Sequence, residues 1–140
     1  MSATEVPIEG LKAALNAGPP LRFAMLFGSA AKGTMRPDSD VDIAIFPIDP
    51  NLALGAELTL QAELNRVCGR DVDLVRLDQA STLVRWQVIR DGRLLIEPVP
   101  FSAARFTAVA AADYIDFAPA FGRAAESFRR RLVASGEDAG

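Results

Sequence analysis

Short apolar runs, each long enough for one strand, alternate along residues 8–96 with segments whose apolar residues recur at helical spacing. Glycine and proline residues separate these segments, beginning with Gly18, Pro19 and Pro20 after the first helical one. In chain order the pattern predicts a helix over 8–16, a strand over 21–27, a helical turn over 28–33, a strand over 41–46, a helix over 52–67, a strand over 72–77, a helix from Asp78 or Ser81 through Arg90, and a strand over 93–96. Elements in that order form a small mixed sheet covered by helices. The sequence therefore predicts an α+β (mixed α/β) fold with about four strands flanked by helices.

Beyond Pro98 the composition changes to alanine and phenylalanine, and no further strand is predicted. Apolar and aromatic residues recur there every three to four positions, at Tyr114, Phe117, Phe121, Ala125, Phe128 and Leu132. This spacing is typical of a helix with one apolar side, bent or broken near Pro119. We therefore expect one domain over 1–140, in which residues 1–98 form the core, 99–134 form a helical tail packed on it, and 135–140 are disordered.

The composition narrows the class of protein. With 140 residues, half of them apolar, the chain suits one domain that buries roughly 68% of its unfolded surface. Because 18 acidic residues outnumber 15 basic ones, duplex DNA and RNA are not expected partners. The first residues lack the basic and apolar regions of a signal peptide, and no window approaches the roughly 20 apolar residues of a membrane span. We expect a cytoplasmic protein without membrane contact.

A single cysteine, Cys68, excludes an internal disulfide, and the absence of histidine leaves oxygen atoms to bind any metal.

Gly28 and Ser29 lie where the first predicted strand passes into the helical turn. Backbone N–H groups at the start of such a turn point outward and favour an anion, which is the geometry that holds phosphates. Gly28 has no Cβ and allows a ligand to approach closely. The turn is therefore a candidate phosphate-binding site.

Two pairs of carboxylates follow the turn. Asp40 and Asp42 lie two residues apart at the start of the second strand, so their side chains project from one face, about 7 Å apart. Asp71 and Asp73 repeat this arrangement at the start of the third strand. If the third strand pairs beside the second, about 4.8 Å away, one carboxylate of the later pair joins the earlier one. Three such anions repel one another unless a divalent cation neutralises them, and Mg²⁺ prefers carboxylate oxygens and substrate phosphates.

The phosphate turn and the carboxylates fit one ligand, a nucleoside triphosphate with its metal ions. Two plainer interpretations remain open. Asp40 and Asp42 could belong to a solvated turn before a strand. Asp73 could be a paired carboxylate at a strand edge.

The pattern of Gly28-Ser29, ten residues, Asp40-x-Asp42 and a third acidic strand resembles the nucleotidyltransferases of the DNA polymerase beta superfamily. More narrowly it resembles the minimal nucleotidyltransferase (MNT) proteins, the antitoxins of HEPN/MNT toxin–antitoxin pairs. The resemblance covers most of the chain, from the first strand through RWQVIRDGRLLIE to ADYIDFAPAF. It implies the nucleotidyltransferase fold.

The resemblance also implies a role for each site residue. Gly28 and Ser29 would contact the nucleotide phosphates, and Asp40 and Asp42 would bind Mg²⁺. Asp73, between Val72 and Leu74, matches the third carboxylate, which would share the metal and help to activate the acceptor hydroxyl. Asp71 is the weaker candidate because it lies at the strand's edge.

The activity implied by the resemblance is transfer of AMP from ATP to a hydroxyl with release of pyrophosphate, assisted by two Mg²⁺ ions. In the family the acceptor is a tyrosine of a HEPN ribonuclease toxin, which adenylylation silences, so a hetero-oligomer with that partner is expected. One alternative is an antitoxin that neutralises its toxin by binding alone. Another is a stand-alone enzyme acting on a small hydroxyl compound, which is disfavoured because only about forty residues follow Ile96 to form a second domain.

Overall fold

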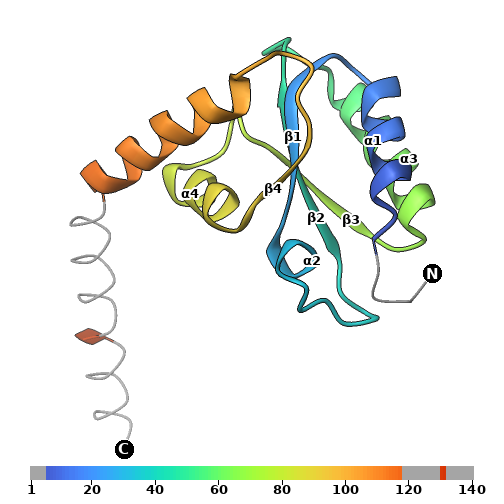
Figure 1. Ribbon diagram of the computed structural model, residues 1–140, viewed down its shortest axis with the longest axis horizontal. Helices are drawn as coiled ribbons and strands as arrows, with labels where there is room; N and C mark the ends of the chain where they lie inside the picture. The colour runs from blue at the N-terminus through green and yellow to red at the C-terminus, as the bar shows by residue number, and fades with distance from the viewer. Residues whose placement is uncertain (1–5, 118–129, 132–140) are drawn as a thin grey trace, which may run out of the picture.

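The computed structural model describes residues 6–117 and 130–131, and the strands among them form one four-stranded sheet (Figure 1). The strand order is β3 (Val72–Arg76), β2 (Val41–Pro47), β1 (Leu21–Phe27) and β4 (Arg93–Ile96). β1 pairs antiparallel with both β2 and β4, whereas β2 and β3 are parallel. The predicted mixed sheet of about four strands flanked by helices is therefore confirmed.

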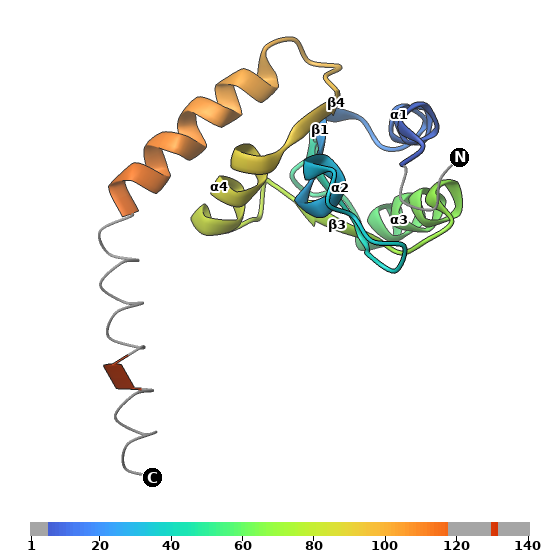
Figure 2. The ribbon, with the colours of Figure 1, turned by 60° about the horizontal axis from the view of Figure 1, so that its bottom comes forward.

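Helices cover both faces of this sheet (Figures 1 and 2). The helices α1 (Ile8–Ala17) and α3 (Leu54–Cys68) lie side by side on one face, and α4 (Thr82–Asp91) lies on the other with a helix over 102–117. The short α2 (Gly28–Lys32) follows β1 directly. No helix among residues 6–117 is both long and apolar enough to cross a membrane.

The predicted start of α4 left two candidates, and the structure decides between them. Ser81 is the N-cap, because its hydroxyl oxygen accepts a hydrogen bond of 3.2 Å from the backbone N–H of Val84. Asp78 instead accepts from Arg76 at the end of β3. Ser81 therefore caps α4, whereas Asp78 forms an ion pair with Arg76.

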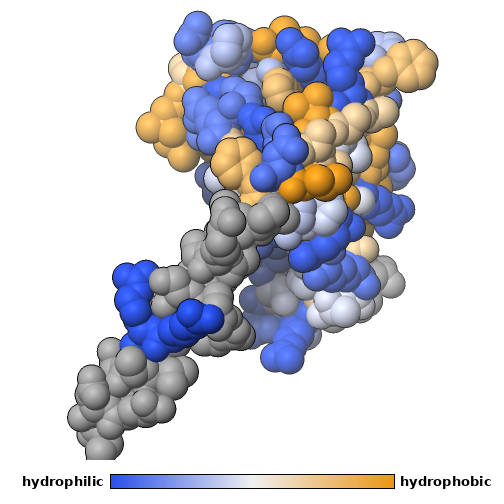
Figure 3. Space-filling view, turned by 90° about the vertical axis from the view of Figure 1, so that its left-hand side faces the viewer, coloured by the Kyte–Doolittle hydropathy of each residue, from blue (hydrophilic) through white to orange (hydrophobic). Residues whose placement is uncertain are grey.

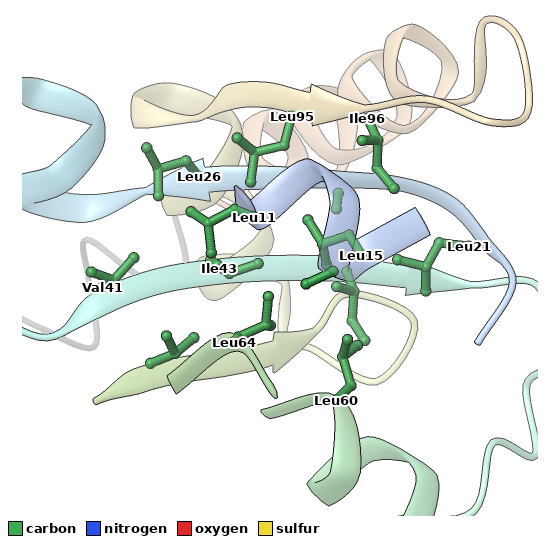
Figure 4. Packing of buried hydrophobic residues seen from close by; sticks show 14 of the residues in the cluster. Leu11, Leu15, Leu21, Leu26, Val41, Ile43, Leu60, Leu64, Leu95 and Ile96 are labelled. Carbon is green, nitrogen blue, oxygen red and sulfur yellow. The ribbon is translucent and has the colours of Figure 1, made fainter. Parts of the chain in front are cut away.

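The larger hydrophobic cluster fills the space between the sheet and the α1–α3 pair (Figure 4). Leu11 and Leu15 of α1 and Leu64 of α3 point toward Leu26 and Ile43 of the sheet. These side chains are almost completely buried. Because successive strand residues point to opposite faces, Asp42 and Ala44 belong to the other face of β2.

A second cluster lies on that other face, beneath α4 and the helix over 102–117. Phe106 contacts Phe23 and Phe46, with ring centroids 5.4 and 5.9 Å apart, and Ala103 and Ala110 lie a helical turn to either side of it. Outside these contacts, apolar and charged side chains intermix over this side of the molecule (Figure 3).

The helix over 102–117 agrees with the predicted helical tail as far as the description extends. Of the predicted apolar stripe, Phe121, Ala125, Phe128 and Leu132 lie outside the described residues, as do Pro119 and the terminal segment 135–140. The division into a core over 1–98 and a tail over 99–134 stays a prediction.

Candidate active site

One row of residues runs across three strands at the edge of the sheet where β1 ends and β2 and β3 begin. Phe27 of β1 is paired with Asp42 of β2, and Asp42 is paired with Asp73 of β3. Residues paired in this way lie on adjacent strands about 4.8 Å apart and project from the same face. The condition set by the sequence, that the third strand pairs beside the second, is met. The pairing brings Asp42 and Asp73 together.

The carboxylates of this row lie on the α4 side of the sheet. Val41 and Ile43, which flank Asp42, are buried in the cluster under α1 and α3, so Asp42 points the opposite way. Asp42 is half-buried, while Asp40 and Asp73 are exposed. Asp73 rather than Asp71 is the partner of Asp42; the carbonyl oxygen of Asp71 accepts from the N–H of Val41 at 3.0 Å.

Gly28 lies against the Asp42 carboxylate. Its φ angle is +68°, and a Cβ at this position would collide with the Asp42 carboxylate oxygen and stand 3.2 Å from the Asp42 Cγ. A larger side chain here would have to displace the Asp42 carboxylate. The sequence predicted a close approach at Gly28 by a phosphate, and in this structure the Asp42 carboxylate makes a close approach. The start of α2 and the start of β2 are therefore in direct contact.

Ser29 is half-buried in the first turn of α2. The residue before α2, Phe27, is extended, and no side chain caps this end of the helix. The first backbone N–H groups of a helix have no partners within it. Those of α2 therefore begin beside the Asp42 carboxylate, where a ligand bound there could reach them.

The charges of Asp40 and Asp73 act on Asp42. Burial raises the pKa of Asp42, and the negative charges of Asp73 and Asp40 raise it further. Within the described part of the chain, however, no three His, Cys, Asp or Glu side chains are gathered closely enough to form a ready-made metal site. Asp42 is thus affected by the charges of its two neighbours, although the three side chains do not yet lie close enough together to form a metal site.

The residues nevertheless fit a hard divalent cation such as Mg²⁺. The chain contains no histidine, so the donors here are oxygen atoms, as Mg²⁺ prefers. Burial is the main cause of the raised pKa of Asp42, and a cation between the carboxylates would relieve the repulsion that raises it further. Asp40, Asp42 and Asp73 are the residues that would hold it.

Arg70 is a positioning residue that the sequence did not reveal. Its guanidinium donates to the carbonyl oxygens of Arg36 and Ser39, at 3.3 Å each, within the loop that leads to Asp40. The loop is thereby held against the start of β3. An arginine after a glycine gives no local signal for such a contact, because its partners lie in a loop far away in the sequence.

A groove of about 1020 Å³ lies between α1 and α3, away from the carboxylates. Small residues line much of it, including Gly10, Ala13 and Gly18 of the α1 region and Ala56 of α3. None of the predicted site residues contributes to it. Its position on the opposite face of the sheet from Asp42 separates it from the candidate site.

The chain resembles known proteins over much of its length. A family model described as polymerase beta, nucleotidyltransferase matches residues 9–99. The protein adenylyltransferase MntA of Shewanella oneidensis is 40% identical over 77 residues, which are 55% of this chain and 55% of that protein. The match thus spans about half the length of this curated relative.

Two solved structures are also similar. A chain of a toxin–antitoxin complex with AMP-PNP is 27% identical with a TM-score of 0.79, covering 89% of this chain and 99% of that one. A chain of an MntA toxin–antitoxin complex, in a variant with two aspartate-to-glutamate substitutions, is 26% identical with a TM-score of 0.80 and the same coverage.

Proposed function

The chain belongs to the polymerase beta nucleotidyltransferase family, and from this membership we propose that it transfers AMP from ATP to a hydroxyl group of a partner protein. The observation that carries the proposal is the contact between Gly28 and Asp42. It brings the turn expected to bind phosphates against the carboxylates expected to bind the metal. A triphosphate and its cation could therefore share one site.

Each site residue has a role in this reaction. The backbone N–H groups of Gly28 and Ser29 hold the phosphates, because they lie at the uncapped start of α2. Asp40 and Asp42 are held beside them and bind Mg²⁺, and Asp73 completes the set from β3. When bound, Mg²⁺ neutralises charge on the phosphates and stabilises the attacking and leaving oxygens.

The bond changes in the proposed transfer balance. The acceptor oxygen forms a bond to the α-phosphorus of ATP, and the bond from that phosphorus to the β-phosphate oxygen breaks, so pyrophosphate leaves. Asp73 is exposed at the sheet edge, where it can accept the proton of the acceptor hydroxyl. Positioning and charge thus account for the catalysis.

We propose further that the acceptor is a tyrosine of a HEPN ribonuclease toxin, which the transfer inactivates. The support is similarity: the curated relative is named a protein adenylyltransferase, and the two similar structures are toxin–antitoxin complexes, one of them with AMP-PNP. The chain would then be an antitoxin that works in a hetero-oligomer. The cytoplasmic location predicted from the sequence stays a prediction.

Mass spectrometry tests the transfer. The chain is mixed with the product of the neighbouring gene and Mg-ATP, and the mass of the partner is measured. We expect a gain of one or more AMP units that requires Mg²⁺. An unchanged partner mass, with both proteins folded, would contradict the proposal.

The binding-only antitoxin is the alternative with different chemistry. It predicts that a variant with both Asp40→Ala and Asp42→Ala still protects cells from the toxin at normal expression. The enzymatic proposal predicts that protection is lost while the complex with the toxin still forms. A pull-down alongside the growth assay separates the two outcomes.

The second alternative, a stand-alone enzyme acting on a small hydroxyl compound, predicts activity without a partner protein. It would consume ATP in the presence of such a compound without any partner protein. Pyrophosphate release that depends on the partner would exclude it.

A further inference from the structure

The short helix α2 lies against β1, β2 and α4. It contains five residues, and none of them is fully buried. Ala30 and Ala31 are partly buried and pack against the larger cluster. Yet α2 begins with Gly28 and Ser29, whose placement against Asp42 is the central feature of the candidate site. A contact that fixes the position of α2 therefore also fixes the position of Gly28 and Ser29 in the candidate site.

Lys32 at the end of α2 makes such a contact. Its Nζ lies 3.3 Å from an Oδ2 of Asp91, the last residue of α4. This ion pair joins two separate elements, whereas the pair of Lys12 with Glu9 joins residues of one helix. Figure 2 shows α2 and α4 on neighbouring parts of the molecule.

Arg90 and Lys32 both contact the Asp91 carboxylate. The Asp91 side chain is only 16% exposed, and Arg90 donates two hydrogen bonds to the same carboxylate, at 3.2 and 3.0 Å. The hydrogen bonds and charges of Arg90 and Lys32 keep the pKa of Asp91 below its usual value. The carboxylate is thus charged at neutral pH.

The stability of α4 does not explain an aspartate at this position. A negative charge at the C-terminus of a helix opposes the helix dipole and is normally unfavourable. Arg90 in the same turn and Lys32 from another element supply the compensating charges. The sheet brings Lys32 and Asp91 together: Leu26 near the end of β1 is paired with Arg93 at the start of β4, so the residues after β1 and before β4 meet.

We infer that the Lys32–Asp91 ion pair positions α2 so that Gly28 and Ser29 are presented to the nucleotide phosphates beside Asp42. Lys32 and Asp91 are positioning residues, and neither is assigned a contact with the substrate. This inference rests on the proposed function, since it concerns the same nucleotide site. Asp91 is the less obvious member, because a residue of α4 is not part of the Gly28-to-Asp42 motif.

Calorimetric titration with AMP-PNP and Mg²⁺ tests the inference on the full chain. The variants are Asp91→Asn, Lys32→Gln and Lys32→Arg. Each of the first two should weaken nucleotide binding roughly two- to fivefold, as expected for a partly exposed ion pair. Lys32→Arg retains the pair and should bind like the wild type. Glu9→Gln, which breaks an exposed ion pair within α1, is the control for a lost surface charge and should have no effect.

The two disruptive variants separate positioning from a simple effect of charge. Asp91→Asn removes a negative charge and Lys32→Gln a positive one, so an electrostatic field effect would change the affinity for the anionic nucleotide in opposite directions. Loss of positioning weakens both. The weakening should also shrink at about 1 M salt, because screening already disrupts the pair in the wild type.

Several outcomes would overturn the inference. Tighter binding by Asp91→Asn would show that the pair withholds Lys32 from the phosphates. A far larger loss in Lys32→Gln than in Asp91→Asn, not restored by arginine, would show that Lys32 contacts the nucleotide itself. Unchanged binding in both would show that α2 needs no such contact. If the wild type binds no nucleotide, the proposed function itself fails, which is a distinguishable result.

Discussion

Gly28 has an unusual backbone conformation and also lies against a candidate metal-binding carboxylate. Its φ of +68° is rare for residues with a Cβ, and an added Cβ would push against the Asp42 carboxylate, so glycine suits both features. The sequence predicted that glycine at this position allows a ligand to approach closely. It did not predict that the close neighbour is a carboxylate, because that depends on how β1 and β2 pair.

Gly28→Ala is expected to destabilise the fold by about 1–2 kcal/mol through its left-handed backbone and to weaken nucleotide binding by displacing the Asp42 carboxylate. Gly69→Ala is the matched control. It has a similar φ of +66° with nothing within 4 Å of an added Cβ, so it should carry the backbone strain without the collision. Urea denaturation measures the first effect and calorimetry the second. Equal nucleotide affinity in the two variants would contradict a special role for Gly28.

Asp42→Asn is expected to stabilise the metal-free fold at pH 7, by at most about 1 kcal/mol because solvent screens the site. Burial and the charges of Asp73 and Asp40 raise the pKa of Asp42 in the folded chain. A carboxyl group with a raised folded pKa contributes stability below its unfolded pKa of about 3.9, and that contribution is lost as pH rises through the folded pKa. Above that range the charged form opposes folding, and asparagine removes this penalty.

Denaturation of wild type and Asp42→Asn at pH 7 and at a pH of about 3 checks the sign. The variant should be the more stable protein at pH 7, and its advantage should disappear in acid. Saturating Mg²⁺ should reverse the order at pH 7, because only the wild type binds it fully. An advantage that is the same at both pH values would show that packing, not charge, distinguishes the two side chains.

At the scale of helices and strands, local patterns were good predictors. The ranges predicted for β1 and β4 agree with the structure, because turns with glycine or proline bound these runs. α3 starts at Leu54 rather than at 52, since Asp49 accepts hydrogen bonds from the N–H groups of Asn51 and Leu52 and forms a turn first. Such a turn competes with the helix for the same backbone groups.

Contacts between elements were not predictable in the same way. The parallel pairing of β2 with β3 remained a condition in the sequence, and the Lys32–Asp91 ion pair could not be foreseen. Each depends on which strands become neighbours, and no local pattern specifies that. The sequence thus named candidate site residues but not the contacts that position them.

Arg76 is the clearest example of a stabilising contact between elements. Its side chain, 10% exposed, pairs with Asp78 and Glu57 and donates to the carbonyl oxygens of Pro50 and Leu52. Arg76→Ala should lower the free energy of unfolding by about 2 kcal/mol, because it leaves carboxylates and carbonyls with lost partners.

Arg66→Ala is the control for this substitution. Arg66 pairs with Glu63 on the exposed side of one helix and is 70% exposed, so its loss should have little effect. Urea denaturation of both variants measures the difference. Equal effects would show that the links from Arg76 add nothing to an ordinary surface pair.

In the whole molecule, one face of the sheet forms most of the hydrophobic core and the other carries the candidate site. The face under α1 and α3 is filled by the larger apolar cluster and gives the fold its core (Figure 4). The other face supports α4 and the helix over 102–117, and it presents Asp42 and Asp73 at its edge. The paired strands that build the core therefore also set the separation of the carboxylates.

Calorimetric titration of the wild-type chain with AMP-PNP, with and without Mg²⁺, tests the shared nucleotide and metal site most directly. We expect one nucleotide bound per chain, only when Mg²⁺ is present, and no binding when Asp40 and Asp42 are both replaced by alanine. Absence of binding to the folded wild type, or binding that neither Mg²⁺ removal nor the double substitution reduces, would contradict it.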